Sequence, residues 1–183
     1  MSHALNHPDP TARRARRIAV EAVLIALIVV SGRYFKVVPN VEWVSLLSLT
    51  AGLLLGAAGG IRVAAAGELL YSLTSPYGLP HPLVLAAQVL GMAPAGLCGG
   101  LLRPRAQPFW VFGAIGLATT LWFDAWTNLA TAVVTAHSPA AQRLALAAAL
   151  PFTAVHVAAN VALFAALGPL LRSRLSPWLS RAL

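Results

Sequence analysis

The chain has 183 residues, of which 58% are hydrophobic and 10% charged, and its formal net charge is +8. Soluble domains carry about 25% charged residues, so this composition excludes most classes of soluble protein. Nucleic-acid binding is also excluded as a function, because it needs basic residues gathered on one folded surface, whereas here they flank apolar runs. A single cysteine, Cys98, precludes an intrachain disulfide. Since no cluster of metal-ligand spacing is present, we expect neither a metal nor another cofactor.

Six apolar runs follow one another along the chain, at residues 18–34, 44–58, 61–73, 82–102, 109–135 and 144–171. A helix needs about 20 apolar residues to cross the hydrocarbon, and fewer where the bilayer thins locally. We therefore predict an all-α fold, a polytopic membrane protein built as one bundle of six transmembrane helices. The second and third helices are short, and Gly59-Gly60 forms a tight turn between them. The expected organisation is a single domain at 18–171, with basic cytoplasmic segments at 1–17 and 172–183.

The basic residues are unevenly distributed among the gaps between these runs. Arg33, Lys36 and Arg143 lie in one set of alternate gaps, and the other ten of the thirteen basic residues lie in the second set: Arg13, Arg14, Arg16, Arg17, Arg62, Arg103, Arg105, Arg172, Arg174 and Arg181. Lys and Arg that flank short loops remain on the cytoplasmic side of a membrane. Both termini are therefore predicted to be cytoplasmic.

Small residues recur at helical spacing in three of the runs. Gly52, Gly56 and Gly60 are four apart, as are Gly91, Ala95 and Gly99, and the first run carries Ala22 and Ala26. Such rows let two helices approach closely where lipid removes the hydrophobic drive for association. The glycine rows are expected to pack within the bundle. The alanine pair is compatible with internal packing or with a partner.

Several polar side chains lie at membrane depth. A charged carboxylate at the bilayer centre costs about 2.5–3.5 kcal/mol on insertion scales, so it should face the interior or an aqueous cavity. Glu21 is one turn from Arg17 and is expected to form a salt bridge. Glu68 needs a partner from another helix or a ligand. Two pairs remain, Asp124 with Asn128 and His156 with Asn160, and each is four residues apart on one face. They are either interhelical hydrogen-bonding residues or the wall of a polar cavity.

The longer loops on the predicted outer side are rich in aromatic and charged residues, including Arg33, Trp43, Tyr77 and His81. A ligand entrance is expected there. The chain has no serine-protease GxSG turn with a partner histidine and no Walker-type phosphate loop. We therefore expect no catalytic residues and no enzymatic activity.

The features above resemble those of a known family, the substrate-binding S components of energy-coupling factor (ECF) vitamin transporters. The similar features are Ala22-x-x-x-Ala26, the glycine-rich run 49–60, the run 90–103 with its basic end, and the two polar signatures at 123–128 and 156–160. The resemblance covers residues 18–171. It implies a multi-pass subunit of the bacterial cytoplasmic membrane that captures a vitamin-like molecule from outside and docks on a transmembrane coupling subunit driven by two ATPases.

The resemblance also implies that Ala22 and Ala26 form the docking face. For the substrate we expect contacts with residues at membrane depth and in the outer loops: Asp124, Asn128, His156, Glu68, His81, Tyr77, Trp43 and Arg33. Cobalamin is one permissible substrate, with His81 as a cobalt ligand. Two other hypotheses stay open: a small permease coupled to protons through Asp124, Glu68 and His156, and a scaffold subunit that transports nothing. The first is disfavoured because no inverted repeat is visible.

Overall fold

A computed structural model describes residues 9–34, 43–104 and 106–179, and all regular elements in these residues are α-helices. In chain order they are α1 (Pro10–Tyr34), α2 (Trp43–Leu73), α3 (Pro82–Leu102), α4 (Phe109–Thr135) and α5 (Pro139–Leu179). The helices α2 to α5 are long and apolar enough to cross a membrane. The predicted all-α class is confirmed for the described residues, and a multi-pass membrane protein fits these helices.

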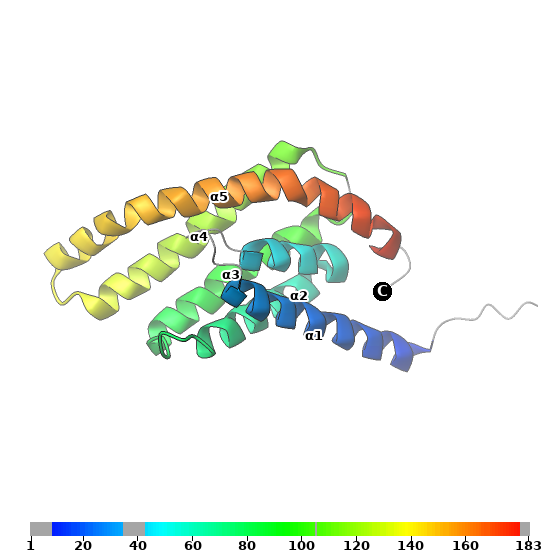
Figure 1. Cartoon of the computed structure of the whole chain (residues 1–183), viewed down its shortest axis with the longest axis horizontal. Coiled ribbons are helices and arrows are strands. Elements are labelled where there is room, and N and C mark those ends of the chain that lie inside the picture. Colours follow the sequence, from blue (N-terminus) through cyan, green and yellow to red (C-terminus); the bar gives the residue numbers. More distant parts are fainter. Residues whose placement is uncertain (1–8, 35–42, 105, 180–183) are drawn as a thin grey trace, which may run out of the picture.

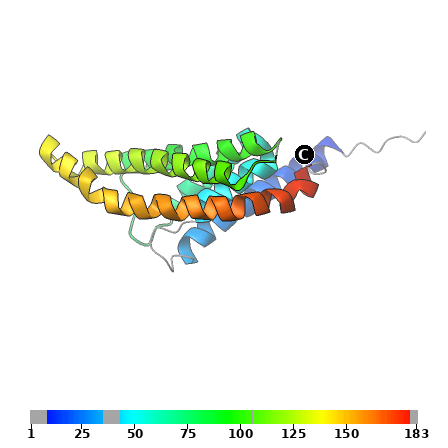
Figure 2. The same cartoon turned by 90° about the horizontal axis from the view of Figure 1, so that it is seen from above.

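The helices run side by side along the long axis of the molecule (Figures 1 and 2). The first residues of α1 and the last described residues of α5 lie at one end, which we call the arginine end. The loops at 74–81 and 136–138 lie at the opposite end, which we call the loop end. Helix α2 packs on α1 and α3, and α4 packs on α5 and α3. The parts of the two predicted tails that the structure describes are mainly helical, since α1 already begins at Pro10 and α5 continues to Leu179.

The sequence predicted two helices, at 44–58 and 61–73, with a turn at Gly59-Gly60. The structure differs both in the number of helical elements and in the position of the turn. Both runs belong to the single element α2, whose backbone leaves the helical conformation at Gly56, with φ 77° and ψ 174°. This region is open essentially to glycine alone, because a β-carbon would clash with the backbone. The six predicted helices thus appear as five among the described residues. The chain turns at Gly56, and Gly59-Gly60 lies within the second half of α2.

The two halves of α2 fold back on each other and on α3 through glycines. A β-carbon at Gly60 would lie 2.6 Å from the Cα of Gly52, and one at Gly52 would lie 2.6 Å from the backbone nitrogen of Gly100. Gly96 likewise meets the backbone of Gly60. Such approaches are closer than any real β-carbon makes, so the glycines here are required by contact. Gly52, Gly60 and Gly99 of the predicted rows therefore pack within the bundle, whereas Gly56 makes the turn, and Gly96 and Gly100 outside those rows also take part.

The apolar interior forms two clusters. One lies between α1, α2 and α3 and contains Ile28, Val63 and Met92 among others, and the second joins α2 and α3 to α4 and α5 around Phe112 and Phe164. Large apolar side chains also cover the outside, for example Leu90, 70% exposed, and Phe152, 68% exposed. A soluble protein rarely exposes apolar surface so extensively, whereas a lipid-facing surface does.

Arginine side chains cap three helix ends. Arg17 Nη2 donates to the carbonyl of Leu55 (3.1 Å), where the first half of α2 ends. Arg33 Nη2 donates to the carbonyl of Tyr71 (2.6 Å) near the end of the second half, and Arg172 Nε donates to the carbonyl of Leu102 (3.3 Å) at the end of α3. The last carbonyls of a helix lack partners within it and carry partial negative charge, so these contacts are favourable.

Candidate ligand site

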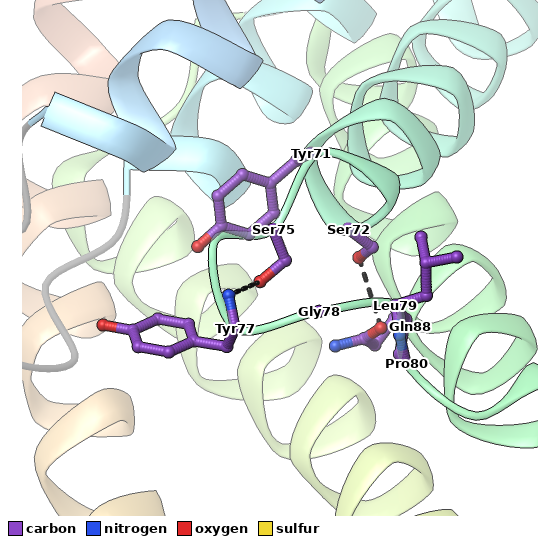
Figure 3. A pocket seen from close by; sticks show the side chains of 8 residues that line it. All are labelled: Tyr71, Ser72, Ser75, Tyr77, Gly78, Leu79, Pro80 and Gln88. Atoms are coloured by element: carbon purple, nitrogen blue, oxygen red, sulfur yellow. Dashed lines mark hydrogen bonds between the residues drawn. The ribbon is translucent and has the colours of Figure 1, made fainter.

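A polar cavity of 340 Å³ lies at the loop end, where α2 ends and α3 begins. Figure 3 shows its lining, which comprises Tyr71, Ser72, Ser75, Tyr77, Gly78, Leu79, Pro80 and Gln88. Most of these residues belong to the loop after α2, whereas Gln88 reaches the cavity from the second turn of α3. Two tyrosines, two serines and one glutamine thus line one space, with the hydroxyls of Tyr71 and Tyr77 directed away from Ser72 and Gln88. This volume is at the lower end of the range of about 300–1,000 Å³ that ligand pockets occupy.

A short hydrogen-bonded chain connects the cavity to a buried carboxylate. Ser72 Oγ lies 3.2 Å from Glu68 Oε1 and also 3.2 Å from Gln88 Oε1. A hydroxyl has one proton to donate, so these two acceptors share it. Glu68 is only 2% exposed, and it lies one helical turn before Ser72. The carboxylate expected to need a partner from another element or a ligand is therefore linked through Ser72 to α3 and to the cavity.

The other residues predicted to bind ligand at the loop end do not all lie at the cavity. Tyr77 lines the cavity and is 87% exposed. His81 is exposed and is the N-cap of α3, where its Nδ1 accepts the backbone N–H of Leu83 (3.2 Å). Trp43 begins α2 and lines a separate apolar groove with Leu27, Val30, Ser31 and Leu47. Of these three, Tyr77 alone contributes to the polar cavity.

Arg33 lies next to the cavity through Tyr71. Its guanidinium is 5.2 Å from the centre of the Tyr71 ring. Its Nη2 also donates to the carbonyl of Tyr71 and to Thr74 Oγ1 (2.8 Å). The positive charge is thus already held by a helix end and an aromatic face.

The predicted polar residues of the last two helices form a ladder between α4 and α5. Its three rungs run from side chain to side chain: Asn160 Nδ2 to Thr120 Oγ1 (2.9 Å), His156 Nδ1 to Asp124 Oδ1 (2.9 Å), and Asn128 Nδ2 to Thr153 Oγ1 (3.2 Å). The three residues of α4 are four apart, so they lie on one face and meet successive turns of α5. The interhelical bonds that the sequence allowed are therefore present.

Two oxygens of the ladder keep an unused hydrogen-bonding capacity. Within the described part of the chain, neither Asp124 Oδ2 nor Asn160 Oδ1 has a hydrogen-bond donor, and both atoms are buried. A buried acceptor without a donor costs about 1–3 kcal/mol. The ladder thus links α4 to α5 and also presents two acceptors to a donor from a water molecule or a ligand.

Phe123 connects the ladder to α3. Its ring makes an edge contact with His156, with ring centres 6.3 Å apart. Its other side packs on Gly91, where a β-carbon would lie 3.1 Å from the ring. Gly91 follows the cavity residue Gln88 by three positions, which is less than one turn of α3. The ladder thus contacts α3 through Phe123, within one turn of the cavity residue Gln88.

Sequence reasoning did not single out Tyr71, Ser72, Ser75 or Gln88. A signal was present for two of them, since Ser72 is four residues after Glu68 and Gln88 is a polar residue in an otherwise apolar run. The proximity of Ser72 to Gln88 depends on how α3 returns along α2.

The predicted docking pair lies on an open surface. Ala22 and Ala26 are both exposed on α1, beside Ile18, Val23 and Leu27. The opposite face of α1 is buried through Leu24 and Ile28. The strip is therefore available to a partner helix or to lipid.

Comparisons with protein-family models, with curated proteins and with solved structures find no match to this chain.

Proposed function

We propose that this protein is a membrane-embedded binding subunit that captures a small polar molecule at its loop end, in the manner of an S component of an ECF importer. The cavity at Tyr71 to Gln88, with Glu68 buried behind Ser72, is the observation that carries the proposal. Groups that accept and donate hydrogen bonds converge there beside apolar walls, as they do in small-molecule sites. A buried carboxylate inside a membrane protein commonly marks such a site.

The orientation follows from the distribution of charge. The arginine end would face the cytoplasm, because arginines in short loops are retained there. The cavity would then open to the outside, and the two halves of α2 would each cross part of the bilayer. With α1 and α3 to α5 this gives the six crossings expected of an S component, and both termini would be cytoplasmic. The membrane would be the bacterial cytoplasmic membrane.

The lining favours a ligand that brings hydrogen-bond donors and lacks a full negative charge. Glu68 Oε1 and Gln88 Oε1 both lie 3.2 Å from Ser72 Oγ, and the carboxyl group behind the cavity disfavours an anionic ligand. The nearby guanidinium of Arg33 is bonded to the end of α2. An amine, amide or polyol of modest size fits this environment better than a phosphate or a carboxylate. The volume of 340 Å³ also favours such a ligand over a whole cobalamin.

Uptake would require the partners implied by the resemblance. The exposed strip at Ala22 and Ala26 is suited to close contact with a helix of a coupling subunit, because alanine lets backbones approach. Two ATPases would drive the release of the ligand inward.

The decisive experiment is mass spectrometry of the small molecule that accompanies the purified protein. The identified molecule is then titrated against Gln88→Leu and against the control Gln142→Leu, which alters an amide at the same end bonded to Ala136. We expect the affinity to fall at least tenfold in the first variant and to stay unchanged in the second. Equal affinities in both folded variants would show that the ligand binds elsewhere.

The pair Asp124 and His156 favours a second candidate, a proton-coupled permease. A carboxylate and an imidazole 2.9 Å apart inside a bundle can exchange a proton. In that case the protein alone, in liposomes with a pH gradient and without ATP, accumulates its substrate. If no ligand accompanies the protein and no gradient drives uptake, the remaining hypothesis is the scaffold subunit, in which the ladder only holds α4 to α5.

A further inference from the structure

The turn of α2 is surrounded by arginines from four helical segments. Arg17 comes from α1, Arg62 from the second half of α2, Arg103 from the residue after α3, and Arg172 from α5. With Glu21 they form what we call the arginine cluster. None of the proposed roles in ligand capture uses it.

The contacts of the cluster place its members next to one another. Arg17 Nη2 lies 3.1 Å from the carbonyl oxygen of Leu55. Arg103 Nη1 lies 3.5 Å from the position of a β-carbon on the adjoining Gly56. Arg172 Nη2 donates to the carbonyl of Arg103 (3.2 Å), so three arginines converge on the turn and the end of α3.

Positive charge exceeds negative charge in this cluster. Glu21 is its one carboxylate among the described residues. It forms salt bridges with Arg62 and with Arg17, and Arg17 Nε lies 3.4 Å from Glu21 Oε1. Among the described residues, Arg17, Arg62 and Arg172 with this one carboxylate leave two positive charges in excess. Asp9, just before α1, accepts the backbone N–H of Thr11 (3.0 Å) at the start of the helix. Positive charge therefore predominates in this part of the described chain, and it favours the binding of an anion.

Exposed apolar side chains lie within two residues of three of these arginines in the chain. Ile61 is 36% exposed beside Arg62, Leu101 is 66% exposed two residues before Arg103, and Leu170 is 49% exposed two residues before Arg172. The side chains of Arg17 and Arg62 are themselves 38% and 52% exposed. A partner that fits must carry a negative charge and apolar chains together. A free phosphate lacks the chains, and an acidic peptide segment does not match an apolar surface of helices.

We infer that the arginine cluster binds the phosphate of an anionic phospholipid, whose acyl chains lie on the apolar surface beside α3 and α5. Guanidinium groups suit phosphate because they donate two parallel hydrogen bonds to it. Basic pockets between membrane helices bind anionic headgroups on the cytoplasmic side by the same chemistry. The lipid would neutralise the excess charge at the turn of α2 and hold α1, α2, α3 and α5 together. This inference is independent of the ligand at the loop end.

The test measures the melting temperature of the purified full chain in mixed micelles of neutral detergent, titrated with dioleoyl phosphatidylglycerol or with dioleoyl phosphatidylcholine. We expect phosphatidylglycerol to raise the melting temperature at lower concentration than phosphatidylcholine. We define the lipid preference as the half-effective concentration of phosphatidylcholine divided by that of phosphatidylglycerol. Each variant is compared with itself in the two lipids, so a loss of intrinsic stability does not affect the ratio.

The variants Arg62→Gln and Arg103→Gln should each lower this preference about fivefold, and the double variant should lower it more. The control Arg143→Gln removes an exposed arginine at the loop end and should leave the preference unchanged. Equal effects of both lipids on the unaltered chain would overturn the inference. So would a preference that survives the double variant, or one that Arg143→Gln reduces equally. If inorganic phosphate alone stabilises the protein as phosphatidylglycerol does, the cluster takes a free anion and the lipid assignment is wrong.

Discussion

Gly60 packs directly on Gly52, although the two residues are eight apart in one helical element. In a straight helix they would be about 12 Å apart, but here a β-carbon on Gly60 would lie 2.6 Å from the Cα of Gly52. The close contact exists because the backbone reverses at Gly56 between them. This reversal places Trp43 and Leu73, the two ends of α2, toward the loop end.

Gly60→Ala should destabilise the protein strongly. The added methyl group would overlap Gly52 and the backbone of Gly96, and neither can move without separating α2 from α3. Overpacking of this kind costs about 1–3 kcal/mol or more. Thermal unfolding in detergent measures it, and Gly113→Ala is the matched control because its nearest neighbour would be 3.5 Å away. Similar melting temperatures for the two variants would contradict the packing described at Gly60.

Gly56→Ala tests the turn itself. Space is not the obstacle here, since the nearest atom to a β-carbon is Arg103 Nη1 at 3.5 Å. The obstacle is the positive φ, and we expect a loss of about 1–3 kcal/mol in the free energy of unfolding. Chemical unfolding in mixed micelles gives the value. A neutral substitution would mean that the chain does not reverse at this position.

Arg33→Gln should destabilise the end of α2. It removes the charged donor to the carbonyl of Tyr71 and to Thr74 Oγ1, and hydrogen bonds to charged groups contribute about 1.5–3 kcal/mol. The control Arg143→Gln removes an exposed arginine at the same end and should change stability by less than about 0.5 kcal/mol. Melting temperatures of the two variants in one detergent decide the matter. If Arg33→Gln has the same melting temperature as the unaltered protein but binds the ligand more weakly, Arg33 belongs to the ligand site.

Asp124 and His156 are best examined as a double-mutant cycle. Replacing each by Ala, singly and together, should give a coupling energy between about 0.6 and 1.7 kcal/mol, the range of interhelical hydrogen bonds in membrane proteins. The same variants are titrated with the co-purified ligand. Under the binding hypothesis Asp124→Ala lowers the affinity of the protein for that ligand. An unchanged affinity in the folded variant, together with a coupling in this range, assigns the pair to holding α4 against α5.

Ala22→Trp should block uptake in cells while leaving ligand binding by the purified protein intact. The bulky ring would prevent the close approach of a coupling subunit to α1, and Ala22 is exposed, so folding is not disturbed. Leu144→Trp is the control, since Leu144 is 72% exposed and lies on α5, away from the docking strip on α1. Uptake that persists in Ala22→Trp would show that the docking face lies elsewhere.

Two features could be predicted from the sequence alone: the all-helical, membrane-spanning class and the grouping of polar residues on helix faces. Runs of apolar residues predicted the helices, because backbone groups in lipid must be satisfied within a helix. The spacing of Asp124, Asn128, His156 and Asn160 predicted two polar faces, since residues four apart share a side of a helix. Glu21 and Arg17 were paired correctly for the same reason. These features are local in the chain, and local periodicity is sufficient to predict them.

The identity of the glycine at the turn and of the residues that share the cavity depends instead on how the helices pack. Gly56, Gly59 and Gly60 look equivalent in sequence, and the contact of Gly60 with Gly52 and α3 leaves Gly56 to adopt the positive φ. Ser72 and Gln88 come together because α3 returns alongside α2. Arg33 and Arg172 cap carbonyls 38 and 70 residues away in the chain. Such contacts depend on the packing of whole helices, which no short stretch of sequence specifies.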